Sequence, residues 1–471
     1  MIELDDNLVS WVTDLRRWFH QHAEPSFEEH NTQDKVVEIL SGLGIEHRRA
    51  GETGVIADIH GNGTGRTDEP PMHCLTGASG ANTDNRADVP EKTICVHPCP
   101  SVVSRSRRIA LRSDTDALRI QEAETELNRD YRSQNPGVMH ACGHDGHMAM
   151  LLGAARWLQE NWNSLPGGVR LIFQPAEEVP PGGAVPMIAD GCLDGVDAII
   201  AVHVFGNMPL SRIGFRPGPF MASSRTFKVT IKGKPGHHMC PQENIDPIQI
   251  AARFISTIQT DIRQRLSPNA RYVLGFGEVH SGMQHNQTPG EARVIGTFRA
   301  YDLLDSERIV AAMQANLDGL MQAFSRENGD CTAANSMLAP AVAQPHCSEG
   351  LSPFSRSPHV PRYVLDAEPA YPPLLNDPVF TRRAAEVLKA SFPDVDDDME
   401  PNLGGEDFAC YLQKVPGLFM FLGGGNPERG ITAMNHSDRF DMDEAVLPTG
   451  IKALLTLTTD FLRDPAPYLG R

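Results

Sequence analysis

The sequence predicts an α/β fold in which a mostly parallel sheet is interrupted by a smaller, inserted α+β unit. Two segments, GGVRLIFQP (167–175) and VDAIIAVHVF (196–205), are almost continuously apolar, which is typical of strands buried on both faces of a parallel sheet. Helical patterns alternate with these strands, as they do where helices cover such a sheet. After GFRPGPF (214–220), segments of alternating polar and apolar residues begin, and these indicate an antiparallel sheet with one exposed face.

The first part of the chain predicts helices and strands in turn. Residues 8–43 carry a helical spacing of apolar residues, which breaks at Ala23-Glu24-Pro25 and ends at a glycine. The other elements of this part are strands at 54–60 and 107–114, a helix at 148–161, and the two apolar strands.

The inserted unit predicts a small antiparallel sheet with a helix. Its elements are alternating strands at 226–234, 272–280 and 292–301 and a helix at 247–266. Helix–strand alternation returns from about 375, with a helix at 380–392 and a strand at 417–423. We therefore divide the chain into residues 1–217, 218–370 and 371–471, with the first and third parts forming one domain.

Two segments fit neither unit. Residues 66–106 and 329–361 show no periodicity and are rich in turn-forming residues, and structureless loops of this length are uncommon inside compact domains. The motif CVHPC (95–99) could form a metal clip, but we favour an unstructured insertion with incidental cysteines.

Composition excludes some classes of partner. The 471 residues carry a formal net charge of −18, which disfavours nucleic acid and anionic membranes, because both need clustered Lys and Arg. The N-terminus has no basic region followed by an apolar one, and no apolar run approaches the length that spans a bilayer. Nine cysteines, an odd number in a long chain, indicate reduced thiols and a cytoplasmic protein.

The motif MHACGHDGHMAM (139–150) concentrates titratable side chains just ahead of a helix. Cys142 and His144 could bind zinc or a similar metal, although a cysteine is often simply buried. Glu177 and Glu178, in QPAEE, follow an apolar strand at the edge where α/β folds build their sites; a solvated loop is the alternative.

Two further histidines are ambiguous on their own. His203 lies near the end of an apolar strand and could be an ordinary core residue, whereas His436 follows a glycine-rich turn and could be a surface residue. Together with Cys142, His144 and Glu178 they make five candidate ligands, too many for one tetrahedral zinc and suitable for two metal ions. Glu177 is then left over as a general base.

An ordered series of motifs resembles a known family. The motifs are RRWFHQHAEPSFEEHNT, LRSDTDAL, MHACGHDGHMAMLLGAA, QPAEE, AVHVF, IKGKPGHH, GGEDFACY and NHSDRFDMDE. In this series the chain is similar to the metal-dependent N-acyl-amino-acid amidohydrolases of the aminoacylase and carboxypeptidase superfamily, in the branch of hippurate hydrolases and auxin-conjugate hydrolases. The similarity extends over nearly the whole chain except the two insertions.

The resemblance implies roles for particular residues. The implied metal ligands are Cys142, His144, Glu178, His203 and His436. They would bind two divalent ions per subunit, and these ions would be zinc, manganese or cobalt. Catalysis falls to Glu177 as acid and base, Asp116 as the residue that orients a ligand, and His237 as the residue that stabilises the oxyanion in the partner subunit's site. Substrate binding falls to Asn286, Arg299 and Glu406.

The resemblance also implies an activity and an assembly. We expect hydrolysis of acetyl, benzoyl or indole-acetyl amino acids, a catalytic α/β domain, and an inserted lid through which a homodimer forms. The chain departs from the family pattern at Pro235, Arg225 and Gln264, which bears on lid geometry and substrate preference. The alternatives are a dipeptidase or carboxypeptidase of the same superfamily, a catalytically impaired metal-binding homologue, and a thiol-based module using Cys142.

Overall fold

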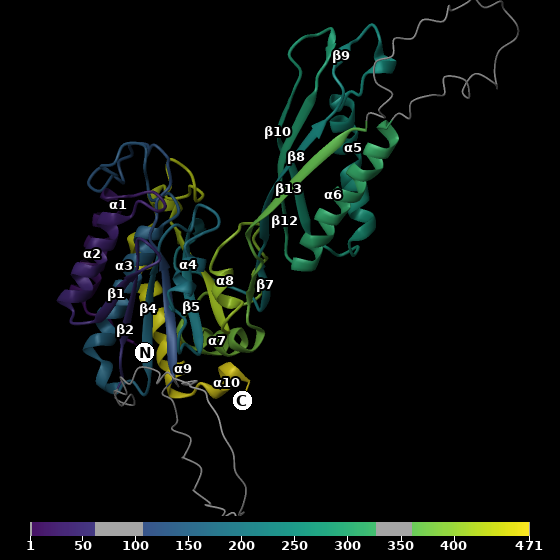
Figure 1. Cartoon of the computed structure of the whole chain (residues 1–471). Coiled ribbons are helices and arrows are strands. Elements are labelled where there is room, and N and C mark those ends of the chain that lie inside the picture. The colour runs from purple at the N-terminus through teal and green to yellow at the C-terminus, as the bar shows by residue number, and fades with distance from the viewer. Residues whose placement is uncertain (1, 62–106, 326–359, 471) are drawn as a thin grey trace, which may run out of the picture.

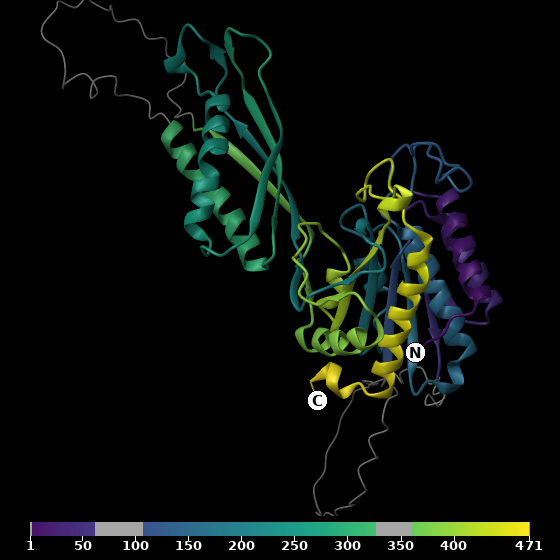
Figure 2. The same cartoon turned by 180° about the vertical axis from the view of Figure 1, so that it is seen from behind.

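The computed structural model describes residues 2–61, 107–325 and 360–470. The predicted insertions and the CVHPC motif therefore lie outside the described residues, except for residues 360 and 361. Figures 1 and 2 show two lobes, a larger one that contains both ends of the chain and a slender one that projects from it.

The larger lobe is built on an eight-stranded sheet. In spatial order its strands are β1 (Glu46–Ala50), β2 (Gly54–Ile59), β4 (Gly168–Gln174), β3 (Arg108–Asp114), β5 (Ala198–Pro209), β16 (Gly417–Gly425), β6 (Ile213–Gly214) and β15 (Val395–Asp396). The neighbours from β4 to β16 run parallel, whereas β1 with β2, β2 with β4, and β16 with β6 are antiparallel. The prediction of a mostly parallel sheet is confirmed for its centre.

The central strands are buried along their whole length because helices pack against the sheet. All residues of β4 and β16 are buried, as their continuous apolar sequences require. The helices of this lobe are α1 (Asp6–Gln21), α2 (His30–Gly42), α3 (His144–Glu160), α4 (Ala184–Ala189), α7 (Pro378–Ser391), α8 (Ala409–Leu412), α9 (Leu447–Arg463) and α10 (Ala466–Leu469). Helices α1, α3 and α9 pack against one another, and α3 and α9 pack on β3 and β5.

One segment, Glu444–Arg463, is long and apolar enough to cross a membrane by length and composition. It ends with α9, and 67% of its most apolar window is buried inside the protein. This is the usual pattern of a core helix, so the feature is weak evidence for a membrane span.

The slender lobe is the predicted α+β unit. Its antiparallel sheet has the order β10 (Tyr272–Ser281), β12 (Glu291–Ala300), β8 (Ser223–Lys232) and β13 (Arg362–Tyr371). Two helices, α5 (Pro247–Arg265) and α6 (Leu303–Phe324), pack on each other and on the sheet. Alternate residues of β8, including Phe227, Val229 and Ile231, are buried in the core of this lobe, as the alternating sequence predicts.

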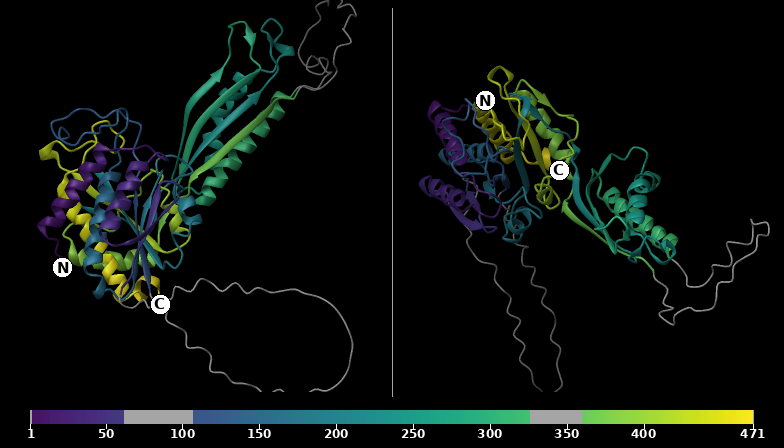
Figure 3. Two further views of the ribbon diagram at one scale, coloured as in Figure 1. Left: turned by 60° about the vertical axis from the view of Figure 1, so that its left-hand side comes forward. Right: turned by 90° about the horizontal axis from the view of Figure 1, so that it is seen from above.

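The chain crosses between the lobes on two neighbouring strands, β8 on the way out and β13 on the way back (Figures 1 and 3). Just outside them, β7 (Gly218–Met221) pairs with β14 (Leu374–Asn376). At the far end of the slender lobe, β9 (Gly236–His237) pairs with β11 (Gln287–Thr288). The slender lobe is called the lid below.

Candidate metal centre

The candidate site lies at the carboxyl ends of the central parallel strands. Glu177 and Glu178 follow the end of β4, His203 lies within β5, and His436 lies in the segment after β16. Because β4, β3, β5 and β16 follow one another in the sheet and run parallel, their carboxyl ends meet at one edge of it. The order of the strands therefore brings together site residues that are far apart in the sequence.

Gly143 separates two of the predicted ligands. It caps α3 in the left-handed conformation with φ 88°, and a Cβ there would lie 3.2 Å from Met442 Cε and 3.3 Å from Phe440 Cζ. Glycine is the residue that accepts both constraints at little cost. The helix predicted from residue 148 begins earlier, at His144, so this ligand sits in the first helical turn.

The five predicted ligands converge on one region. Cys142 Sγ lies 3.4 Å from His203 Nε2 and 3.3 Å from His436 Nε2. Glu178 Oε1 lies 3.2 Å from His436 Nε2 and 3.8 Å from His144 Nε2. Overlapping groups of these donors, each within 4.8 Å of one another, include all five residues.

The ring orientations decide which nitrogens can bind a metal. His144 Nδ1 contacts the backbone oxygen of Asp116 at 2.8 Å, and His203 Nδ1 contacts that of Val204 at 3.0 Å, so both rings turn Nε2 toward the cluster. His147 differs, because its Nδ1 lies 2.6 Å from Asp114 Oδ1 and its Nε2 accepts the N–H of Val204. Both ring nitrogens of His147 therefore have protein partners, and with Asp114 and His144 it forms a separate group of potential metal donors.

Asp116 holds the segment that carries the two glutamates. Its two carboxylate oxygens accept the N–H groups of Glu177 and Glu178, each at 3.0 Å, and the hydroxyl of Ser26 at 2.7 Å. Burial alone would raise the pKa of this carboxyl, but the neighbouring His144 ring, followed by the Glu178 N–H and the Ser26 hydroxyl, holds the pKa below its usual range.

A buried cluster of charges lies beside the glutamates. Arg112, which is fully buried, pairs with Asp114 at 2.8 Å, Glu406 at 3.1 Å and Asp407 at 3.0 Å. One guanidinium thus faces three carboxylates. Burial raises the pKa of Glu177 well above its usual range, and Glu406 is the largest electrostatic contributor.

The thiol of Cys142 is in a similar environment. Burial raises its pKa well above the usual range, and the carboxylates of Glu178 and Glu177 raise it further. A thiolate at this position is therefore unfavourable unless a cation compensates it.

A cavity of about 350 Å³ opens onto the cluster. Four of the predicted ligands line it together with Glu177, and Arg299 from the lid and Glu406 lie on its wall. Its other lining residues include Phe205, Met221, Tyr371, Asn402 and Met434.

Two predicted residues are not brought to this cavity. His237 lies in β9, and Asn286, which precedes β11, accepts the N–H of His238 at 3.1 Å. Figure 1 places this strand pair at the end of the lid that points away from the large sheet. His237 and Asn286 therefore lie next to each other but apart from the metal cluster of their own chain.

The sequence analysis missed several residues of the site. Arg112 and Asp407 form the charge cluster, Asp114 orients His147, and Asn435 donates to the backbone oxygens of Cys142 and Val204. All four residues lie inside motifs quoted in the sequence analysis, so their positions in the sequence pointed to the site. Their residue types alone did not show which role each would have.

The departures from the family pattern concern the lid. Arg225 pairs with Glu307 of α6 on the helix side of the sheet, so it does not face the cavity.

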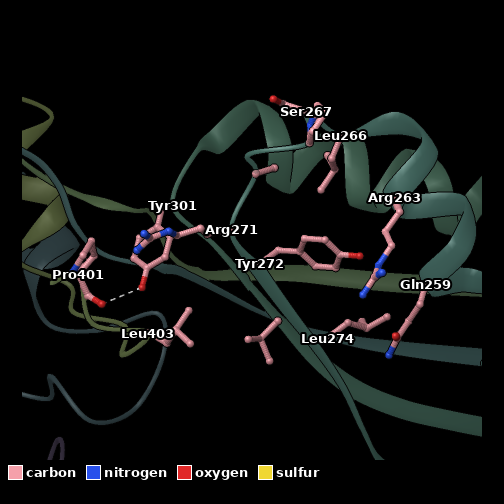
Figure 4. Close-up of a pocket in the computed structure, with 13 residues that line it drawn as sticks. Gln259, Arg263, Leu266, Ser267, Arg271, Tyr272, Leu274, Tyr301, Pro401 and Leu403 are labelled. Atoms are coloured by element: carbon pink, nitrogen blue, oxygen red, sulfur yellow. Dashed lines mark hydrogen bonds between the residues drawn. The ribbon is translucent and has the colours of Figure 1, made fainter.

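A separate cavity of about 910 Å³ lies where the lid meets the larger lobe (Figure 4). Arg263, Arg271 and Tyr272 line it, and the Tyr301 hydroxyl donates to the Pro401 oxygen at 3.0 Å. None of the predicted ligands lines this cavity.

Comparison with known proteins identifies the class. A model of the peptidase family M20/M25/M40 matches residues 110–460, and the chain belongs to this family and is a hydrolase. It is 31% identical to "Thermostable carboxypeptidase 1" of Saccharolobus solfataricus over 96% of both chains. It is 33% identical to "N-acyl-L-amino acid amidohydrolase" of Geobacillus stearothermophilus over 68% of this chain and 74% of that one.

A solved structure shares the fold. The YXEP protein of Bacillus subtilis, described as a dinuclear metal binding peptidase from the M20 family, is 27% identical with a TM-score of 0.71, covering 98% of this chain and 100% of that one. The α/β fold with an inserted α+β lobe is thus that of the family.

Proposed function

We propose that this protein is a metal-dependent amidohydrolase that cleaves N-acyl amino acids to a carboxylic acid and a free amino acid. The observation that carries the proposal is the convergence of three imidazole Nε2 atoms, one thiol and one carboxylate, from five residues of which four line the cavity. The similarity to a relative named as an N-acyl-L-amino acid amidohydrolase supports the substrate class.

The donor set fits two divalent cations. His144 Nε2 is buried and has no hydrogen-bond partner among the described residues, and buried polar atoms of this kind normally have one. We propose Cys142, His144, Glu178, His203 and His436 as the ligands. Their mixed sulfur, nitrogen and oxygen chemistry suits zinc, with manganese and cobalt as alternatives.

A metal pair held here would supply a Lewis acid for the amide carbonyl and lower the pKa of the attacking water. Glu177 lines the same cavity, and in this proposal its carboxylate would act as the general base toward the attacking water and as the general acid toward the leaving nitrogen. Asp116 positions Glu177 and Glu178 through their backbone N–H groups.

The lid supplies the substrate contacts in this proposal. Arg299 lies on the cavity wall and would bind the carboxylate of the amino acid, with Glu406 on the same wall. His237 and Asn286 would act in the site of a second subunit, because they lie at the far end of the lid. The protein is then a homodimer whose lid, residues 218–370, separates two parts of the catalytic domain, residues 1–217 and 371–471.

We also propose a cytoplasmic location. The cysteines of the described residues, Cys142, Cys192, Cys240 and Cys410, are free thiols, which is typical of reducing compartments.

The test is metal reconstitution. The protein is stripped of metal, reloaded with zinc, manganese or cobalt, and assayed for release of free amino acid from N-acetyl, N-benzoyl and indole-acetyl amino acids. Metal-dependent release is expected, and the Glu177→Gln variant should bind metal without turnover. Stoichiometric metal binding with no release from any substrate would contradict the proposal.

Carboxypeptidase activity is the second candidate, because a relative at 31% identity carries that name. Relative kcat/KM values for N-acyl amino acids and for dipeptides separate the two activities. Faster cleavage of dipeptides would assign the chain to the second.

A further inference from the structure

Tyr371 lies where the lid meets the metal site. It is the last residue of β13 and pairs with Ser224 near the start of β8, so it stands on one of the two strands that connect the lobes. Its side chain is nevertheless buried, with 7% of the residue exposed, and lines the cavity above the metal cluster.

The ring and the hydroxyl of Tyr371 have different partners. The hydroxyl donates to the backbone oxygen of Glu177. The ring covers Gly405, where an added Cβ would lie 3.3 Å from Tyr371 Cδ2. Tyr371 thus touches both the segment of the proposed base and the segment that carries Glu406.

The segment around Glu177 needs support from outside itself. Ala176 has a positive φ of 52°, which is unfavourable for a residue with a Cβ. Its N–H donates to Glu29, and the next two N–H groups donate to Asp116. The carboxylates of Glu29 and Asp116 thus accept hydrogen bonds from the N–H groups of this segment. Among the described residues, the Glu177 carbonyl oxygen accepts its hydrogen bond from the Tyr371 hydroxyl.

The geometry points to Tyr371 as a positioning residue, contributed by the lid strand β13, that fixes the Glu177 peptide through its carbonyl oxygen. Rotation of this peptide would move the side chains on either side of it, which are the proposed base Glu177 and the proposed ligand Glu178. Tyr371 acts through the backbone of these residues. The inference rests on the proposed function.

The test compares Tyr371→Phe with a matched control. Tyr371→Phe keeps the ring on Gly405 and removes only the hydroxyl. Tyr301→Phe removes a hydroxyl that also joins the lid to a backbone oxygen of the larger lobe, that of Pro401 at 3.0 Å (Figure 4), but this bond lies outside the catalytic cavity. Both proteins are full-length and reloaded with zinc.

Tyr371→Phe is expected to lower kcat about tenfold and zinc affinity, measured by competition with a chelator, by a similar factor, as loss of an orienting partner does at metal sites. KM should stay unchanged, and Tyr301→Phe should match the wild type in all three quantities. Gly405→Ala keeps the Tyr371 hydroxyl but adds a methyl group 3.3 Å from the ring, which would push the hydroxyl away from the Glu177 oxygen, so it should also lower kcat.

Unchanged kcat and zinc affinity in Tyr371→Phe would overturn the inference. A raised KM with unchanged kcat would also overturn it, because Tyr371 would then be a substrate contact. If the wild type hydrolyses none of the substrates, the proposed function fails, while the zinc affinities of the two tyrosine variants still decide the role of Tyr371.

Discussion

Replacing Asp116 by asparagine is expected to weaken metal binding more than it weakens the fold. Asp116 accepts hydrogen bonds on both oxygens, from Glu177 N–H on one and from Glu178 N–H and Ser26 on the other. Asparagine has one oxygen and one NH₂ group, so in either orientation a donor meets a donor. A hydrogen bond to a charged acceptor contributes about 1.5–3 kcal/mol, and 1.4 kcal/mol is about tenfold in affinity.

We therefore expect Asp116→Asn to lower zinc affinity by about 10- to 100-fold. The assay is competition between the protein and a chromophoric chelator. The control is Asp58→Asn, which breaks a two-point pair with Arg170, with contacts of 2.9 and 2.8 Å, on the strand pair β2–β4. The control should lower thermal stability without changing zinc affinity. Equal zinc affinities in Asp116→Asn and the wild type would refute the role given to Asp116.

Further predictions concern catalysis, local structure and pH. Glu177→Gln should keep its full metal content, measured by elemental analysis, and lose about 100-fold or more in kcat, because general bases typically contribute 10²–10⁴-fold; near-normal turnover would sink the assignment. Gly143→Ala should lower the free energy of unfolding by about 1–2 kcal/mol through its left-handed backbone, with a further penalty from the contact with Met442; an unchanged urea midpoint would contradict this. Burial opposes the charge on His20, but Asp145 and Glu122 raise its pKa to about 9. Because this folded-state value exceeds the usual 6.5, the stabilisation should be complete below that pH and disappear as pH rises through 9. Urea unfolding of the wild type and His20→Gln from pH 6 to 10 measures it, and parallel pH profiles would contradict it.

The metal donors could be predicted from the sequence because their chemistry resides in residue type and local spacing. Cys142 and His144 flank a glycine before a helix, and Glu178 follows an apolar strand; strand order then brings them together. The central strands could also be predicted, because their short, continuous apolar runs are typical of strands buried in a parallel sheet.

Residues whose roles depend on distant partners could not be predicted in this way. Arg112 faces Asp407, which lies 295 positions away in the sequence. His147 differs from His144 only through the bonds that both of its ring nitrogens make. Tyr371 has no chemical motif around it, and its role depends on a strand that returns from the other lobe.

The paired strands β8 and β13 also determine how far the lid reaches. Each is 10 residues long, or about 33 Å at the usual rise of a strand. An insertion of one residue in each strand would exchange their buried and exposed faces. Two inserted residues in each strand would preserve this alternation and lengthen the arm that carries His237 by about 7 Å, whereas a single inserted residue would need a β-bulge such as the register shift already present in β13.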